Sequence, residues 1–222
     1  MDCMEYMRQL PDKHFQLSIV DPPYGIGNDG SKNKSRGKQA VTARVSKSKA
    51  LAKAKDYKGF AGGDVSAPPL EYFNELRRVS KNQIIWGANH FISKIPFDSS
   101  CWIIWDKDNG DSDFADAELA WTSFKSAVRV FKFKWKGMLQ QNMKDKEHRI
   151  HPTQKPVALY KWLLSNYAKP GDKILDTHLG SGSSRIAAYD MGFDFYATEL
   201  DKYYFDAQEK WFQNFKSQLK LF

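Results

Sequence analysis

The sequence contains few cysteines and no long apolar segment. Only Cys3 and Cys101 are present, and two cysteines provide neither a disulfide framework nor a set of metal ligands. No segment approaches the about 20 consecutive apolar residues of a membrane-spanning helix. The first residues also lack the basic and apolar regions of a secretory signal. We therefore expect a protein of the reducing cytoplasm that has no membrane partner.

Basic residues outnumber acidic ones. The chain has 34 Lys and Arg against 26 Asp and Glu, a formal net charge of +8 and a pI of about 9.3. This excess suits a polyanionic partner, although a merely soluble basic surface explains it equally well. With 222 residues, 41% of them hydrophobic, the chain can bury one core but cannot hold a second large domain. We therefore expect a single domain over residues 1–222, and we find no internal repeat.

Strands and helices alternate along the sequence. Apolar runs predict strands at residues 15–20, 83–86, 101–105, 173–176 and 193–198. Helices are predicted at residues 69–79, 156–168, 183–191 and 201–219, and residues 119–124 and 127–133 could pair as strands. Strands that alternate with helices form a mostly parallel sheet with right-handed crossovers and helices on both faces. The sequence thus predicts an α/β fold.

Residues 25–66 differ from the rest of the chain. Between Gly30 and Phe60 there are ten Lys or Arg and one acid, with little hydrophobic periodicity. This composition is typical of a mobile basic loop, here with partial helix expected near residues 45–55. Loops of this length are usually functional lids or disordered segments.

The tetrapeptide Asp21-Pro22-Pro23-Tyr24 follows the first predicted strand. Proline cannot donate to a sheet ladder, so Asp21 projects from the carboxyl end of the strand, where open α/β sheets bind ligands. The Asp21 carboxylate and the Pro22 carbonyl can accept both hydrogens of an exocyclic amine, which directs the nitrogen lone pair toward an incoming methyl group. Tyr24 offers a face on which an extruded base can stack. The alternative is a strand-ending turn followed by a core tyrosine.

A loop with two glycines follows the strand at residues 173–176. Such a strand-to-helix loop brings backbone N–H groups close to a ligand, although a plain tight turn is the alternative. Glu199 ends the next strand, 23 residues after Asp176, where a carboxylate can accept both ribose hydroxyls of a nucleoside. Arg185 stands where a dinucleotide fingerprint would have its third glycine. We therefore interpret the loop as a nucleoside site and not a pyrophosphate site.

The order of these motifs resembles that of a known family. Asp-Pro-Pro-Tyr at 21–24 is followed by His-Pro-Thr-Gln-Lys-Pro at 151–156 and by Asp-Thr-His-Leu-Gly-Ser-Gly-Ser-Ser at 176–184. This order resembles the β-class DNA amino-methyltransferases, the N6-adenine and N4-cytosine DNA methylases, in which the motifs are circularly permuted. The resemblance covers nearly the whole chain. It implies a Rossmann-like methyltransferase fold, S-adenosylmethionine over the strand ends, a flipped base and no metal.

The resemblance also implies residue roles. The catalytic residues would be Asp21, Pro22, Pro23 and Tyr24. The cofactor-binding residues would be Asp2, His151, Thr153, Lys155, Asp176, Thr177, His178, Gly180, Ser181, Gly182, Ser183 and Glu199. His178 takes the place of an aromatic cofactor contact, because the family usually has Pro-Phe-Ala where this chain has Thr-His-Leu. Without the resemblance, His151 could be a surface loop residue and Lys155 a solvated lysine at a helix start.

The region before Asp2 departs from the family pattern. Similar enzymes have a strand there, and the acidic residue that follows it lies near the cofactor adenine. Here Met1 directly precedes Asp2. We hypothesise that the chain is shortened at its start, which would leave the N-terminal strand missing and an edge of the sheet bare.

Two basic regions are candidates for DNA contact, namely the loop at residues 25–66 and a small target-recognition insertion at residues 107–150. Residues 125–149 hold eight basic residues against two acids, a balance that suits phosphate neutralisation. Phe131, Phe133 and Trp135 could contact bases, but their alternation with lysines favours a strand with a buried aromatic face. The acids at 106–118 lack the pattern of a calcium loop, so we expect a solvated turn there.

We expect the chain to transfer a methyl group from S-adenosylmethionine to N6 of adenine in double-stranded DNA, since family members with Asp at the first motif position favour adenine. The alternatives are an N4-cytosine enzyme, an RNA or protein amide methyltransferase of the Asn-Pro-Pro-Tyr kind, and a catalytically silent DNA-binding protein. The small recognition region favours a stand-alone or phage-type enzyme in the cytoplasm of a bacterial or phage-infected cell. A homodimer and a restriction endonuclease partner stay open.

Overall fold

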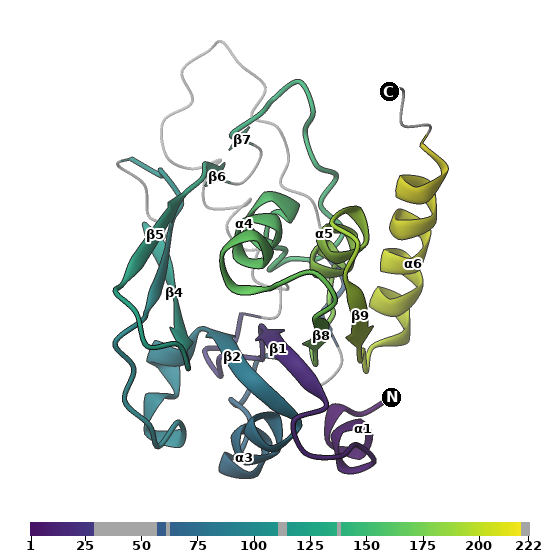
Figure 1. Cartoon of the computed structure of the whole chain (residues 1–222). Coiled ribbons are helices and arrows are strands. Elements are labelled where there is room, and N and C mark those ends of the chain that lie inside the picture. Colours follow the sequence, from purple (N-terminus) through teal and green to yellow (C-terminus); the bar gives the residue numbers. More distant parts are fainter. Residues whose placement is uncertain (29–56, 61–62, 111–114, 137–138, 219–222) are drawn as a thin grey trace.

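The computed structural model describes residues 1–28, 57–60, 63–110, 115–136 and 139–218. Seven strands form one sheet in the order β5-β3-β4-β2-β1-β8-β9, and β6 and β7 form a separate pair (Figure 1). The strands are β1 (Phe15–Val20), β2 (Ser80–Trp86), β3 (Ile103–Asp106), β4 (Ala117–Thr122), β5 (Arg129–Lys132), β6 (Trp135–Lys136), β7 (Leu139–Gln140), β8 (Lys173–Asp176) and β9 (Asp194–Ala197). The helices are α1 (Cys3–Arg8), α3 (Leu70–Val79), α4 (Val157–Tyr167), α5 (Ser183–Asp190) and α6 (Lys202–Ser217), with short 3-10 helices η1 (Ala88–His90) and η2 (Ile92–Lys94).

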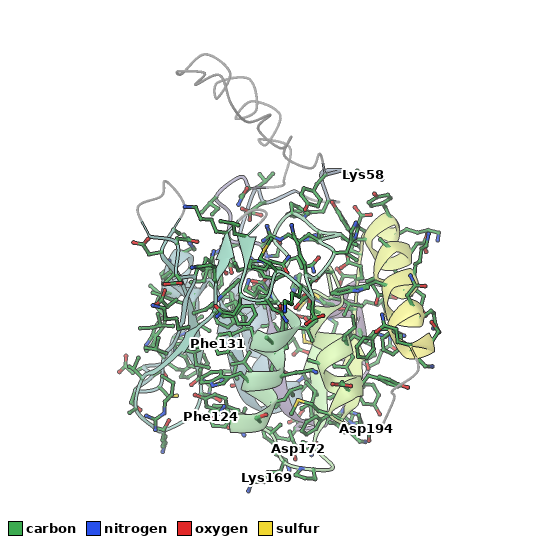
Figure 2. All side chains as sticks on the ribbon, turned by 90° about the horizontal axis from the view of Figure 1, so that it is seen from above. Lys58, Phe124, Phe131, Lys169, Asp172 and Asp194 are labelled. Carbon is green, nitrogen blue, oxygen red and sulfur yellow. The ribbon has the colours of Figure 1, made fainter. Side chains whose placement is uncertain are left out.

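Strand β1 lies in the centre of the parallel part of the sheet. It pairs in parallel with β2 on one side and with β8 on the other, and β8 pairs in parallel with β9. Parallel strands end at the same edge of a sheet, so Asp21 after β1 and Asp176 at the end of β8 lie at one edge. In Figure 2, Lys58 lies at this end of the molecule, and Lys169 and Asp172 lie at the opposite end.

Helices cover both faces of the sheet, as predicted. Helices α1 and α3 lie on one face, where Leu76 packs in a buried apolar cluster with Val20. Helices α4 and α5 lie on the other face, where Leu159 packs in a second cluster with Ile19. Successive side chains of a strand point to opposite faces, so neighbouring residues of β1 contribute to the two clusters. β1 is thereby buried on both sides, which fixes the position of the segment that follows it.

The predicted pairing of residues 119–124 with residues 127–133 is wrong. Strand β3 lies between β4 and β5, pairing with β4 in antiparallel and with β5 in parallel orientation. The reason is burial: Ile103 and Trp105 of β3 are almost completely buried, whereas Val130 of β5 is 58% exposed. The more apolar strand takes the inner position, and the basic strand forms the edge.

The alternating aromatic residues Phe131, Phe133 and Trp135 point toward the core, as expected for a strand with one buried face. The rings of Phe131 and Phe133 are stacked with centroids 5.7 Å apart, and both pack against the apolar cluster beneath α4. The intervening lysines form ion pairs with Asp108. The acidic turn is therefore tied to β5 through its charges.

Helix α1 was not predicted, although the sequence carries its signal. The Asp2 carboxylate accepts hydrogen bonds from the N–H groups of Met4 (2.9 Å) and Glu5 (3.0 Å), which caps the helix. An N-terminal acid followed three residues later by glutamate is a capping-box pattern. Asp2 is thus held in one orientation at the end of the molecule that carries Asp21.

The two expected DNA-contacting regions fall partly outside the described residues. Residues 29–56 and 61–62 of the basic loop are not described, and neither are residues 111–114 and 137–138 of the recognition insertion. Both regions stay predictions, and the helix expected near residues 45–55 lies wholly outside the described ranges. Within those ranges, no helix is long and apolar enough to cross a membrane.

Candidate active site

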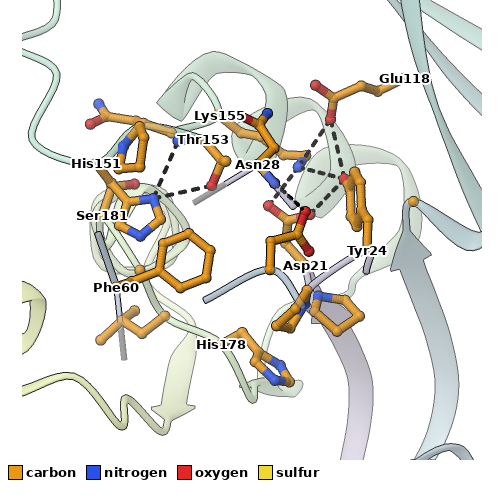
Figure 3. Close-up of a pocket in the computed structure, with 18 of the residues that line it drawn as sticks. Asp21, Tyr24, Asn28, Phe60, Glu118, His151, Thr153, Lys155, His178 and Ser181 are labelled. Carbon is orange, nitrogen blue, oxygen red and sulfur yellow. Dashed lines mark hydrogen bonds and ion pairs between the residues drawn. The ribbon is translucent and has the colours of Figure 1, made fainter. Parts of the chain in front are cut away.

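A cavity of about 1390 Å³ opens at the carboxyl ends of β1 and β8. It is larger than a usual small-molecule pocket, so a nucleoside cofactor and a second ring fit together. The predicted site residues that line it are Asp2, Asp21, Pro22, Pro23, Tyr24, His151, Thr153, Lys155, Thr177, His178, Gly180, Ser181 and Glu199. The other three predicted site residues, Asp176, Gly182 and Ser183, are buried and are not among the lining residues. Segments that are distant in the sequence therefore converge on one cavity (Figure 3).

The Asp21 carboxylate has a partner on each oxygen. The Tyr24 hydroxyl donates to Asp21 Oδ1 at 2.8 Å, and Lys155 Nζ lies 2.5 Å from Asp21 Oδ2. Only 3% of the Lys155 side chain is exposed, so it is not the solvated lysine of the alternative interpretation. Burial raises the pKa of Asp21, the Lys155 charge opposes this, and Glu118 adds to it. The structure therefore places Lys155 beside Asp21 and Tyr24 of the tetrapeptide.

Glu118 extends this pair into a row of alternating charges. Its carboxylate lies 2.5 Å from Lys107 Nζ and 3.1 Å from Lys155 Nζ, and it also accepts a 3.3 Å hydrogen bond from the Tyr24 hydroxyl (Figure 3). Burial opposes the ionisation of Glu118, but the two lysines lower its pKa to about 2. Sequence reasoning missed Glu118 and Lys107, because a strand-borne acid and a loop lysine carry no motif.

The Tyr24 ring is held from the side of η1. Its face stacks on His90 with centroids 5.2 Å apart and planes 18° apart. Gly87, with φ of 71°, lies so close that an added Cβ would be 2.1 Å from Tyr24 Cε1. Only glycine fits there, since the conformation is left-handed and the ring fills the space. Neither Gly87 nor His90 was predicted as a site residue.

Asp64 fixes the turn that follows Tyr24. Its carboxylate accepts hydrogen bonds from the N–H groups of Gly25 (2.7 Å), Ile26 (3.2 Å) and Asn28 (2.9 Å). Asp64 is only 4% exposed, so these bonds satisfy a buried charge. Sequence reasoning missed this residue, which lies at the far end of the basic loop.

The glycine loop is fastened by the two acids that flank it. Asp176 is buried and accepts from the Ser184 hydroxyl at 2.6 Å and from the His178 N–H at 3.0 Å. Burial raises its pKa to about 7, although these two hydrogen bonds oppose the rise. Glu199 accepts from the Gly180 N–H at 2.7 Å. Asp176 therefore shapes the loop from below, whereas Glu199 faces the cavity.

His151 sits between aromatic rings on the glycine-loop side. Its ring stacks on Phe60, with centroids 5.5 Å apart, and meets Tyr204 edge-on at 4.3 Å. Burial, together with the nearby Lys155 charge, lowers its pKa to about 4, so the ring is neutral at pH 7. Thr153 Oγ1 lies 3.1 Å from His151 Nδ1. His151 is thus a wall of the cavity, and Phe60 is a further wall that carried no sequence signal.

The strand ends of this open α/β sheet bring three features to one cavity: the Asp-Pro-Pro-Tyr segment, the glycine loop and the Glu199 carboxylate. This arrangement defines a Rossmann-like methyltransferase fold. The sequence matches the family described as DNA methylase over residues 15–210, and the chain belongs to this N6/N4 DNA methylase family. The predicted family and fold class are thereby confirmed.

Several known DNA methyltransferases resemble this chain over most of the chain's length. It is 27% identical to the type II methyltransferase M.HinfI of Haemophilus influenzae over 94% of its own length, and it spans 66% of that protein. The M1.HpyAVI–SAM complex shares the fold with a TM-score of 0.52 and 23% identity, covering 95% of this chain and 96% of that one. The PvuII cytosine-N4-specific DNA methyltransferase has a TM-score of 0.56 and 11% identity, covering 100% and 86%.

Proposed function

We propose that this chain is a DNA methyltransferase that transfers a methyl group from S-adenosylmethionine to an exocyclic amine of a base flipped out of duplex DNA, with N6 of adenine as the target. The observation that carries the proposal is the meeting of Asp21 and Tyr24 with the glycine loop and Glu199 in one cavity. Family membership and the M1.HpyAVI–SAM complex support the choice of cofactor.

The residues of the cavity fit this cofactor. Each oxygen of Glu199 accepts one backbone N–H, from Gly180 and Asp201, and keeps a lone pair for a ribose hydroxyl. S-adenosylmethionine would supply a methyl group on a positively charged sulfur. The amine nitrogen would bond to the methyl carbon as the carbon–sulfur bond breaks, S-adenosylhomocysteine would leave, and the proton lost by the amine would pass to the Asp21 carboxylate. The described residues contain no group of three or more His, Cys, Asp or Glu that could hold a metal ion.

The proposed reaction assigns distinct tasks to the catalytic motif. The Asp21 carboxylate and the Pro22 carbonyl accept the two amino hydrogens of the target base, which directs the nitrogen lone pair toward the methyl group. Tyr24 stacks on the base. Asp21 Oδ1 accepts the Tyr24 hydroxyl and keeps a lone pair for an amino hydrogen. If the amine takes the place of that hydroxyl, Glu118 is a second acceptor for the hydroxyl proton.

Lys155 keeps Asp21 ionised in this scheme. Its ammonium opposes the effect of burial on the Asp21 pKa. Glu118 shares the same ammonium, so Lys155 is itself held in place by two carboxylates. The pairs are nearly buried and are therefore little screened by salt.

Adenine is proposed over cytosine because Asp stands at the first position of the tetrapeptide. Both bases present an amine beside a ring nitrogen, and the PvuII enzyme, of the same fold, is cytosine-N4-specific by name. Double-stranded DNA would contact the basic regions at residues 25–66 and 107–150. The enzyme would act in the cytoplasm.

Transfer of labelled methyl groups tests the proposal. Purified protein and labelled S-adenosylmethionine would be incubated in parallel with duplex DNA, structured RNA and a protein extract. Label in DNA alone is the expected result. Label confined to RNA or protein would overturn the proposal, and DNA binding without transfer would identify a catalytically silent module.

A further inference from the structure

Three side chains form a buried hydrogen-bonded chain behind the glycine loop. The Tyr72 hydroxyl from helix α3 lies 2.6 Å from Thr177 Oγ1, and Thr177 Oγ1 lies 2.9 Å from His178 Nδ1. Tyr72 is 1% and Thr177 is 3% exposed, so both hydroxyl groups are shielded from solvent. Thr177 and His178 line the cavity, whereas Tyr72 is not among its lining residues (Figure 3).

The donor and the acceptor in each of these two hydrogen bonds follow from which group has a proton that needs an acceptor. Thr177 Oγ1 is the one hydrogen-bond partner of the Tyr72 hydroxyl among the described residues. Burial raises the pKa of Tyr72 well above its ordinary value, so its proton is present and must be donated to Thr177. The Thr177 hydroxyl then donates its own proton to His178 Nδ1. If Thr177 donated to Tyr72, the Tyr72 proton would have no acceptor among the described residues. If His178 Nδ1–H and Tyr72 both donated to Thr177, the Thr177 proton would have none.

His178 carries a single ring proton at neutral pH. Burial lowers its pKa to about 4, and the nearby Asp2 carboxylate only partly offsets this effect. Since Nδ1 is the acceptor of the Thr177 proton, the ring proton resides on Nε2. Nε2 has no hydrogen-bond partner among the described residues, and His178 shares the cavity wall with Asp2 and Cys3.

We propose that the Tyr72–Thr177 chain fixes His178 as the Nε2–H tautomer, and that this N–H donates a hydrogen bond to a ring nitrogen of the cofactor adenine. Adenine presents acceptors at N1, N3 and N7, so a neutral donor is complementary to it. The proposal rests on the proposed function in that the cavity must bind S-adenosylmethionine. Tyr72 and Thr177 are then positioning residues, and His178 is a cofactor-binding residue that replaces an aromatic contact with a hydrogen bond.

The tautomer can be measured without any cofactor. Ring nitrogen shifts of His178 in protein labelled with ¹⁵N-histidine distinguish Nε2–H from Nδ1–H. The wild-type protein and Thr177→Ser, which keeps the hydroxyl, are expected to show Nε2–H. Thr177→Val removes the donor to Nδ1, so the Nδ1 resonance of this variant is expected to shift toward that of a ring nitrogen without a hydrogen bond. An Nδ1–H ring in the wild-type protein, or an Nδ1 resonance that is unchanged in Thr177→Val, would overturn the proposal.

Binding of S-adenosylhomocysteine and its 1-deaza, 3-deaza and 7-deaza analogues, measured by calorimetry, tests the partner of Nε2–H. The analogue that lacks the ring nitrogen bonded to Nε2–H is expected to bind the wild-type protein about tenfold more weakly than S-adenosylhomocysteine, a loss of about 1.4 kcal/mol in binding free energy. His178→Phe keeps a ring but has no donor, so it should bind S-adenosylhomocysteine and that analogue alike.

The outcomes separate this inference from the proposed function. If the folded wild-type protein does not bind S-adenosylhomocysteine, the proposed function fails. If it binds, but no analogue is penalised more in the wild-type protein than in His178→Phe, only the hydrogen bond to adenine is refuted. Thermal melting of the wild-type protein and His178→Phe confirms that each is folded before binding is compared.

Discussion

Replacing Lys155 by methionine removes the charge that two buried carboxylates share. Asp21 then keeps only the Tyr24 hydroxyl, whereas Glu118 keeps Lys107 at 2.5 Å. Breaking a buried pair costs about 3–5 kcal/mol, and because Glu118 retains a partner we expect the lower end, about 3 kcal/mol. Lys161→Met is the matched control: it breaks an ion pair whose lysine is 41% exposed, and it should cost less than about 1 kcal/mol.

The loss of folding stability in Lys155→Met should also depend on pH. Burial already raises the pKa of Asp21, and without the lysine charge the pKa rises further, so the folded variant takes up a proton more readily than the unfolded chain does. The stability of the variant then falls as the pH rises from the Asp21 pKa of the unfolded chain to that of the folded variant. Its stability deficit relative to the wild-type protein therefore shrinks at low pH. The raised pKa of Lys155 means that its own contribution is complete at neutral pH.

Urea unfolding followed by circular dichroism across acidic to neutral pH measures both effects. The ion-pair reasoning would be refuted if Lys155→Met lost no more stability than Lys161→Met, or if its deficit were the same at every pH.

Two further changes test other parts of the site. Gly87→Ala places a Cβ 2.1 Å from the Tyr24 ring and should lower methyl transfer about 100-fold by displacing it, whereas Gly171→Ala, also left-handed but with no atom within 4 Å, should leave transfer unchanged. Equal activities would contradict this. Burial raises the pKa of Glu147 to about 7, so this residue, together with Asp176, should make stability fall from pH 4.5 to 7, and Glu147→Gln should make that slope shallower in urea unfolding. An unchanged slope would exclude Glu147 as its source.

The parts of the fold that were predicted correctly carry strong local signals. Strand β1 ends where expected because two prolines follow Val20, and β8 ends at Asp176, where the glycine loop begins. The order of β3, β4 and β5 could not be predicted from the sequence. It depends on which strand exposes the least apolar surface when it lies at the edge of the sheet. Helix α3 was placed correctly, yet its apolar Leu70 is exposed and its Tyr72 is buried.

The residues of the candidate site that belong to sequence motifs were predicted, and the others were not. The tetrapeptide, the histidine segment and the glycine loop meet in one cavity, as the permuted motif order implied. Glu118, His90 and Phe60 could not be foreseen, since each belongs to a segment without a motif and arrives only through the packing of the sheet. Tyr72 likewise reads as one more apolar helix residue until its hydroxyl is found beside Thr177.

The most direct test of the proposed function is the identity of the methylated nucleoside. Duplex DNA treated with S-adenosylmethionine and either the wild-type protein or Asp21→Ala would be digested to nucleosides and analysed by mass spectrometry. In Asp21→Ala, Lys155 keeps Glu118 as its partner, so the variant should fold and bind S-adenosylhomocysteine. We predict N6-methyl-2′-deoxyadenosine with the wild-type protein and none with the variant. N4-methyl-2′-deoxycytidine would contradict the choice of base, and equal methylation by both proteins would contradict the catalytic role of Asp21.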